Sequence, residues 1–236
     1  MQPPPDIETS SADYAARFSG PAGEYLLEVQ DASVEALISG NAHGSLLDVG
    51  GGHGQLLGLY ARLGMDVTVH GSDAQCFARL GQATTSMQHV VSDICALPFE
   101  DRSFDVVVAV RLISHMDDWP AVLAELCRVA RSTVVIDYPS KRSLNAATPL
   151  LFKLKSGIEK NTRTYTSFSH NQLKNVFVAR GFSRVTEYKQ FFFPMVIHRM
   201  LGGGILPRVA EKACRTIGIT KLFGSPIMLK AERDIV

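Results

Sequence analysis

Short apolar runs and longer segments with one apolar face alternate along the middle of the chain. Five runs are typical of strands, and the one at residues 104–110 is nearly all apolar, as a strand covered on both faces must be. Regular alternation of strand and helix predicts a parallel sheet with right-handed crossovers. The runs cover residues 45–50, 66–72, 88–93, 104–110 and 132–138, and the helical segments between them residues 55–64, 74–82 and 117–131.

The two flanks of this region follow other patterns. Residues 1–12 are rich in proline and polar residues, which favours a disordered tail, and residues 23–38 are expected to form a helix. Towards the C-terminus, Ser169 and Gln172 form a capping box, and Gly181 ends the helix that they begin. Two more strands are expected at residues 183–193 and 225–233, with short helices over residues 195–222 between them.

Composition is ordinary for a globular protein, with 46% hydrophobic residues, 20% charged residues and a net charge of +1. The charge is unevenly distributed. Residues 1–138 hold 7 Lys/Arg and 18 Asp/Glu, whereas residues 139–236 hold 17 and 5. Two interpretations stay open: the basic half faces an anionic partner or a membrane surface, or two oppositely charged faces of one domain attract each other.

Cysteine usage and the absence of export signals bear on the compartment. The cysteines are far apart, without the spacing of a zinc site, so we expect small apolar side chains in a reducing compartment. The N-terminus lacks a basic region followed by an apolar core, and no run approaches the ~20 apolar residues of a membrane span. A cytoplasmic location is therefore expected. The four cysteines are Cys76, Cys95, Cys127 and Cys214.

Four glycines follow the first strand, at the start of its helix: Gly50, Gly51, Gly52 and Gly54. Glycine lets the backbone turn sharply and approach a ligand closely. The beginning of a helix adds unpaired N–H groups, and nucleotide ligands bind at the carboxyl ends of parallel strands. The segment predicts a nucleotide-type site, although dehydrogenases that bind NAD also have a glycine-rich turn.

Three acidic residues narrow the choice of ligand. Asp73 lies just past the second strand, where a carboxylate can accept both ribose hydroxyls, which suits NAD equally well. Asp48 lies two residues before Gly50, where a carboxylate suits a cationic ligand end better than a pyrophosphate. Asp93 ends the third strand and is suited to accept the adenine amino group. The NAD pattern GxGxxG also fails here, because Gln55 stands where its last glycine is expected.

These residues resemble a known family. The segment LLDVGGGHGQLL resembles motif I of class I S-adenosylmethionine-dependent methyltransferases. The segment HVVSDICALPFEDRSFDVVVAVRLISHM is similar to the small-molecule branch that includes ubiquinone and menaquinone methyltransferases. The resemblance covers residues 44–140 well and the rest in outline. It implies a Rossmann-like α/β fold, with a seven-stranded, mostly parallel sheet, helices on both faces, an antiparallel last strand and a helical insertion before it.

The resemblance also implies roles for individual residues. S-adenosylmethionine would be the cofactor and S-adenosylhomocysteine the product. Asp48 and the glycines of the turn would hold the methionine end, and Arg111 would lie near the carboxypropyl group or the substrate. The ribose would contact Asp73 and Ala74, and the adenine Asp93 and Ile94. One domain over residues 13–236 would then comprise a helical lid (13–43), a cofactor-binding core (44–140) and a substrate-side region (141–236).

Four residues are candidates for the acceptor side. His115 lies just past the fourth strand and is the best candidate for a general base, which is needed only if the acceptor must lose a proton. The alternative is that it packs at the rim or caps the next helix. Tyr14 and Arg17 are candidates for closing over the cofactor, or else begin a surface helix. Tyr138 ends the fifth strand and is expected to line the substrate pocket. No metal site is expected.

Acceptor specificity is expected from outside the shared core. Residues 190–224 are rich in large apolar residues and carry several basic ones, a pattern that suits a small lipophilic or anionic acceptor, methylated on oxygen or carbon. Transient contact with a membrane surface is a further hypothesis. No nucleic-acid partner is expected, because no RNA-binding module is recognisable. The alternatives are RNA methylation through the basic half and a binding module without catalysis; nothing in the sequence indicates an oligomeric state.

Overall fold

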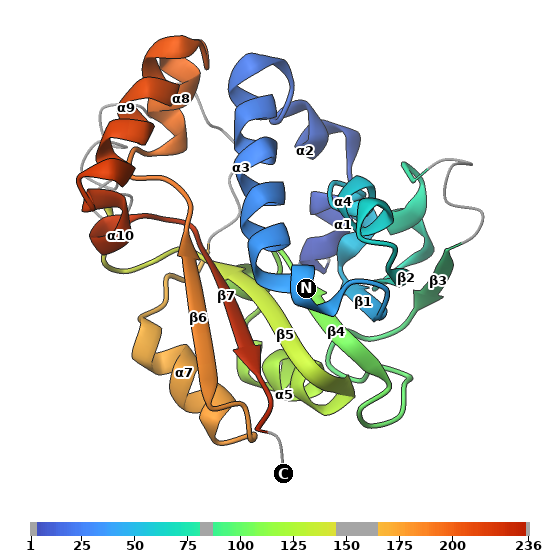
Figure 1. The fold of residues 1–236 in the computed structure, drawn as a ribbon. Coiled ribbons are helices and arrows are strands. Elements are labelled where there is room, and N and C mark those ends of the chain that lie inside the picture. Colours follow the sequence, from blue (N-terminus) through green and yellow to red (C-terminus); the bar gives the residue numbers. More distant parts are fainter. Residues whose placement is uncertain (1–3, 81–86, 145–164, 235–236) are drawn as a thin grey trace.

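The computed structural model describes residues 4–80, 87–144 and 165–234, and its strands join into one seven-stranded sheet (Figure 1). The strand order is β3-β2-β1-β4-β5-β7-β6. The first five strands are parallel, and β7 runs antiparallel to both β5 and β6. The strands are β1 (Ser45–Val49), β2 (Asp66–Gly71), β3 (Gln88–Val91), β4 (Phe104–Ala109), β5 (Ala130–Tyr138), β6 (Arg184–Lys189) and β7 (Ile227–Glu232). The expected Rossmann-like architecture, including the inserted antiparallel strand, is confirmed.

Helices cover both faces of this sheet (Figure 1). The helices α3 (Gly20–Ile38) and α4 (Leu57–Arg62) pack on one face, and α5 (Trp119–Val129) and α7 (His170–Val178) on the other. The helices α8 (Met195–Met200), α9 (Ile205–Thr216) and α10 (Ile219–Phe223) form the expected insertion before β7. In the described residues no helix is long and apolar enough to cross a membrane.

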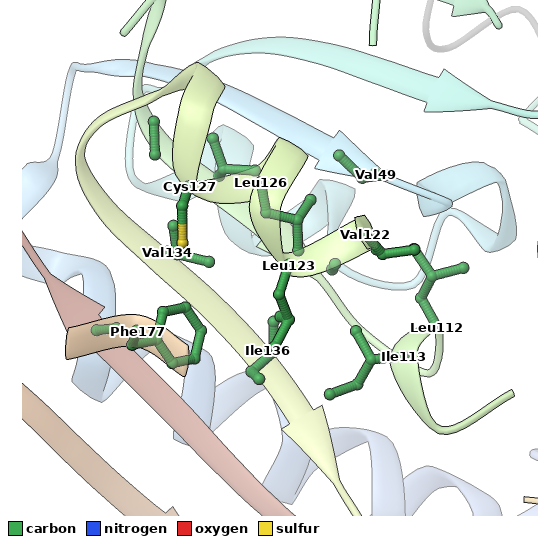
Figure 2. Close-up of a cluster of buried hydrophobic side chains, with 14 of the residues drawn as sticks. Val49, Leu112, Ile113, Val122, Leu123, Leu126, Cys127, Val134, Ile136 and Phe177 are labelled. Atoms are coloured by element: carbon green, nitrogen blue, oxygen red, sulfur yellow. The ribbon is translucent and has the colours of Figure 1, made fainter. Parts of the chain in front are cut away.

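The hydrophobic core lies on both faces of the central strands. On the face of α5, Leu123 and Leu126 lie over Val134 and Ile136 of β5, and Phe177 of α7 completes the layer (Figure 2). Each of these side chains is fully buried. Since truncating a buried leucine costs about 2–5 kcal/mol, the packing of this layer fixes the positions of the loops at the strand ends.

Local signals explain where several helices begin and end. Asp118 accepts a hydrogen bond from the Ala121 N–H and caps α5. Ser169 likewise accepts from the Gln172 N–H at the start of α7, as the capping box predicts, and Gly181 follows the helix with a φ of 79°. The helix expected over residues 74–82 is instead a short 3₁₀ turn, Ala74–Phe77, because its N–H groups bond three residues back; residues 81–82 lie outside the described residues.

The prediction of a disordered tail over residues 1–12 is wrong from residue 4 onward. The helices α1 (Pro5–Thr9) and α2 (Ala12–Ala16) form there, and α1 packs against the glycine turn. Proline at the first helical position and Asp6 in the first turn favour this helix, a start signal that composition alone obscured. Residues 1–3 lie outside the described residues.

Candidate cofactor site

The glycine turn follows directly from the end of β1. Gly50 has a φ of 73° and donates its N–H to the His70 carbonyl of β2 at 2.9 Å, so the turn is fastened to the neighbouring strand. A Cβ on Gly51 would lie 2.3 Å from Cγ of Asp48. Glycine is therefore required twice, once for the left-handed backbone and once for close contact with a carboxylate.

Asp48 is a buried carboxylate that accepts no hydrogen bond from the described part of the chain. Its exposed fraction is 1%, and neither oxygen has a hydrogen-bond partner among the described residues. The Tyr60 hydroxyl lies nearby, outside the geometry of a hydrogen bond, and burial followed by the charge of Asp48 raises its pKa, while the hydroxyl in turn opposes the rise of the Asp48 pKa. Burial raises the pKa of the Asp48 carboxyl to about 7. A cationic ligand group at the turn would offset this burial, which fits the expected ammonium end of the cofactor.

Two further acids follow the next strands along the same edge. In the register of the sheet, Val49 of β1 pairs with His70 and Gly71 of β2 pairs with Val91, so the carboxyl ends of β1, β2 and β3 lie together. Asp73 and Asp93 come two residues after β2 and β3 and are both exposed. Each uses one carboxylate oxygen to accept a backbone N–H two residues on, which orients it and leaves the other oxygen to a ligand.

The structure places the remaining predicted cofactor residues less uniformly. Ala74 is exposed beside Asp73, as expected. Ile94 buries its side chain in the core cluster on the α5 face, so only its backbone lies beside Asp93 at the edge. His53 in the turn is buried, and burial lowers its pKa to about 3, which keeps the imidazole neutral. Among the described residues no group of three metal-ligating side chains occurs, so nothing there suggests a metal centre.

Arg111 directly after β4 connects the turn to the N-terminal helices. Its φ is 60°, rare for a residue with a side chain, and its N–H donates to Asp137 Oδ1. The guanidinium donates to the side-chain carbonyls of Gln30 and Gln55 and lies 4.0 Å from the ring centroid of Phe18. No carboxylate of the described residues pairs with the guanidinium. The cation is thus held in place by neutral groups, and its charge remains for a ligand.

The N-terminal segment closes over this edge. Tyr14 of α2 lies with its ring centroid 5.9 Å from the Arg111 guanidinium carbon, and burial raises the pKa of its hydroxyl. Arg17 stacks on the Tyr14 ring at 4.9 Å and pairs with Glu8 at 3.5 Å. The structure therefore brings Tyr14 to the site, whereas Arg17 lies behind it.

Asp6 fastens α1 to the site, a feature that the sequence analysis missed. The carboxylate is 1% exposed and accepts hydrogen bonds from both the N–H and the hydroxyl of Ser72, each at 2.6 Å. Ser72 immediately precedes Asp73, and the Asp6 side chain lies beside Gly50. The helix expected to be disordered is therefore part of the wall of the site.

His115 lies close enough to Asp137 for the two groups to interact electrostatically. His115 ends a 3₁₀ turn, Ile113–His115, after β4, and it is half-buried. Burial raises the pKa of Asp137, while the charges of Arg111 and His115 oppose the rise. Residues two apart in a strand point to the same face. Asp137 lies two residues after Val135 in β5 and Asp48 two after Leu46 in β1, and Val135 and Leu46 belong to one core cluster, so Asp137 and Asp48 share a face of the sheet. Sequence reasoning named His115 but not the neighbouring Asp137.

Tyr138 does not line the site, and the prediction that it would is wrong. Successive residues of a strand point to opposite faces, so Tyr138 lies on the α5 and α7 face, where its ring packs against Phe168. It is fully buried and donates to Glu187 of β6, which also binds His170 of α7. The group is a structural link between β5, β6 and α7.

Comparisons with known proteins agree with this geometry. Residues 47–136 match the model of the methyltransferase domain family, whereas no curated protein matches the sequence. Among solved structures, magnesium protoporphyrin IX methyltransferase from Synechocystis PCC 6803, with S-adenosylhomocysteine bound, has a TM-score of 0.64 at 14% identity, covering 97% of this chain and 98% of that one.

Two other structures show how widely this fold is used. 1,6-Didemethyltoxoflavin-N1-methyltransferase from Burkholderia thailandensis has a TM-score of 0.56 at 15% identity and covers 89% of this chain and 79% of its own. A (4+2)-cyclase has a TM-score of 0.57 at 16% identity and covers 87% and 81%. At these identities the likeness concerns the fold.

The fold, the turn and the family match define a class I methyltransferase domain. Residues 47–136 match this family, and the fold of the chain is the one seen in solved structures of S-adenosylmethionine-dependent methyltransferases. The orphaned carboxylate of Asp48 and the tight glycine turn fit the cofactor, which supplies an activated methyl group when bound.

Proposed function

We propose that the protein is an S-adenosylmethionine-dependent methyltransferase and that it acts on a small acceptor that is lipophilic or anionic. The observation that carries the proposal is the Arg111 guanidinium, oriented by Gln30, Gln55 and Phe18 without a carboxylate partner in the described part of the chain. An anionic group of the acceptor, or the carboxylate of the cofactor, would complete its coordination.

An aromatic cluster beside Arg111 supports a lipophilic acceptor. Phe18, Leu26 and Phe191 are buried together, with Tyr14 and Tyr25 packed against them. These residues come from the N-terminal segment, α3 and the segment before α8, outside the core that the family shares. The names of the two methyltransferases compared above record small molecules as acceptors, magnesium protoporphyrin IX and 1,6-didemethyltoxoflavin.

The pair His115 and Asp137 would serve an acceptor that loses a proton. Asp137 is held by the Arg111 N–H and would stabilise a protonated His115. Methyl transfer itself needs alignment of the acceptor atom with the methyl group and exclusion of water, which the packing of α1 and α2 over the edge favours. Methylation of an oxygen or carbon atom would use His115 as the base, and the other residues of the site would hold and orient the acceptor and the cofactor.

Cofactor binding is tested by thermal unfolding of the full chain with S-adenosylmethionine, S-adenosylhomocysteine or NADH. A ligand at 100 times its dissociation constant stabilises the fold by about 2.7 kcal/mol, so the shift in Tm is easily measured. We expect both sulfur nucleotides to raise Tm, Asp73→Ala to remove the rise, and Asp66→Ala, an exposed acid at the opposite end of β2, to retain it. A response to NADH alone would contradict the assignment.

The acceptor class is tested by transfer of a radiolabelled methyl group to three pools: quinones, fatty acids with polyketides, and tRNA. Label in an organic-soluble or anionic small molecule supports the proposal. Label in tRNA, with binding that weakens as salt rises, would favour RNA methylation instead. Cofactor binding without label in any pool, even with a full cell extract of metabolites, would favour a domain that keeps the fold without methylating.

We also propose that α8 to α10 touch an anionic membrane surface while the acceptor is collected. Large apolar side chains are exposed there beside basic ones, including Ile205 at 82% and Lys212. Co-sedimentation with phosphatidylglycerol vesicles should exceed that with neutral vesicles, and Ile205→Ser with Leu206→Ser should abolish it. Equal recovery with both vesicle types would overturn the proposal. The exposed apolar residues are Met200, Leu201, Ile205, Leu206, Val209, Ile217, Leu222 and Phe223.

A further inference from the structure

A cleft of about 270 Å³ opens at the edge of the sheet opposite the cofactor site. Arg102 lies just before β4, Cys127 and Arg128 lie at the end of α5 before β5, and Arg233 follows β7. The end of β7 lies near the bottom of Figure 1, beside the turn between α7 and β6, and Arg180 follows α7 there. Four arginines that are distant in sequence therefore line one cleft.

One of the four arginines is neutralised within the protein. The Arg128 guanidinium binds Glu125 at 2.8 Å and Asp101 at 2.9 Å, and it also donates to the carbonyls of Leu97 and Phe99. Asp101 is the one carboxylate that lines the cleft, among the residues described. The negative charge at this place is therefore already committed to Arg128.

The other three arginines have no carboxylate partner in the described ranges. Arg233 donates to the carbonyls of Cys127 and Ala130 and lies over the Phe182 ring, and its Nε is buried without a partner. Within the described ranges the Arg180 guanidinium donates to the Val176 carbonyl alone. Among the described residues no hydrogen bond or ion pair involves the guanidinium of Arg102, whose backbone has a φ of 56°.

These cations act on one another. Burial lowers the pKa of Arg233, and the charge of Arg102 lowers it further. Arg180 and Arg233 both lie close enough to the Cys127 thiol to oppose the rise of its pKa that burial causes. Mutual repulsion in a half-buried cleft destabilises the protein unless an anion fills it.

We propose that this cleft binds a small phosphate-bearing ligand at a site separate from the cofactor site. Arg233 is fixed by backbone carbonyls at the base of the cleft, and Arg102 and Arg180 would close on the anion with their guanidinium groups. The planar fork of arginine matches phosphate oxygens in pairs. The volume suits a group the size of pyrophosphate better than a large ligand, since drug-sized ligands occupy about 300–1,000 Å³. The inference does not depend on which acceptor is methylated.

Inorganic pyrophosphate titrated into the full chain by calorimetry, at constant ionic strength, tests the site. We expect saturable binding of one ligand per chain. Arg102→Gln, alone and with Arg180→Gln, should weaken binding at least tenfold, because each removes charge-assisted hydrogen bonds. The matched control is Arg184→Gln, which removes an exposed arginine at the start of β6 outside the cleft and should change affinity less than twofold.

Three results would overturn the site: no saturable binding up to about 10 mM, a double variant that binds like the wild type, or equal weakening in the Arg184→Gln control. The last result would mean a diffuse positive field without a defined site. Because the Arg102 side chain forms no hydrogen bond or ion pair among the described residues, its variant is expected to fold normally, and an unchanged affinity for S-adenosylhomocysteine at the other edge checks this directly.

Discussion

The two edges of the same sheet carry opposite kinds of unpaired charge. At the carboxyl edge Asp48, Asp73 and Asp93 surround a glycine turn, and Asp48 is buried without a partner. At the amino edge Arg102, Arg180 and Arg233 surround a cleft without free carboxylates in the described residues. A protein that needed only stability would pair such charges with each other. Their separation is what the two proposed sites require, because each edge then keeps its charge for a ligand of the opposite sign.

The carboxyl edge should lose turnover most when its proposed base is removed. For His115→Ala we expect turnover to fall by about 10²–10⁴-fold, the range for loss of a general base. The dissociation constants of S-adenosylhomocysteine and of pyrophosphate should stay within about twofold, since neither site includes the imidazole. Turnover equal to that of the wild type would reduce His115 to a packing residue at the rim.

Replacing the buried carboxylate should have opposite effects on stability and on binding. The folded-state pKa of Asp48, about 7, is raised above the ordinary value of 3.8. Protonation therefore favours the folded state, and this stabilisation is complete below pH 3.8 and is lost as pH rises to 7. For Asp48→Asn without ligand we expect a gain of roughly 2–4 kcal/mol at pH 8 that vanishes near pH 4.

The same variant should bind the cofactor at least tenfold more weakly at pH 8, because the partner of the ammonium group is gone. Urea unfolding at the two pH values and calorimetry with S-adenosylhomocysteine provide the two readouts. A variant that is less stable at pH 8 than the wild type would show that Asp48 already has a partner inside the protein.

Filling the turn should damage the carboxyl edge alone. Gly51→Ala places a methyl group 2.3 Å from Cγ of Asp48, so the carboxylate or the backbone must move. We expect a loss of about 1–3 kcal/mol of stability, typical of overpacking, and a comparable loss of cofactor affinity. Gly40→Ala, where nothing lies within 4 Å, is the control. Pyrophosphate binding should be unaffected, and equal effects of both variants would contradict the crowding argument.

The smallest effect is expected from releasing α1. Asp6→Ala removes two partly buried hydrogen bonds to Ser72 and should cost about 1–2 kcal/mol, with faster proteolysis of the N-terminal segment. Glu8→Ala on the same helix removes only a partly exposed pair with Arg17 and should cost less than about 1 kcal/mol. Similar proteolysis of both variants would mean that α1 is not held by Asp6.

Local patterns predicted the central strands and the order of elements, because buried strands and amphipathic helices have distinct periods. They failed where the structure depends on distant partners. In the sequence Asp6 belongs to a polar segment, and only its hydrogen bonds to the distant Ser72 show its role. Tyr138 lies on the opposite sheet face from Asp137, because successive residues of a strand alternate between faces and a shift of one residue reverses the assignment. The arginine cleft is assembled from residues more than 130 positions apart, so no local signal marks it.

The backbone of Arg111 lowers the stability of the fold, while its side chain contributes to the candidate site. A left-handed backbone suits glycine, and a residue with a side chain there costs on the order of 1–3 kcal/mol. At this position a glycine would thus relax the backbone while removing the cation that Gln30 and Gln55 hold in place. Selection for thermal stability alone is therefore expected to favour replacement of Arg111, and the selected variants would be more stable but would have an impaired site.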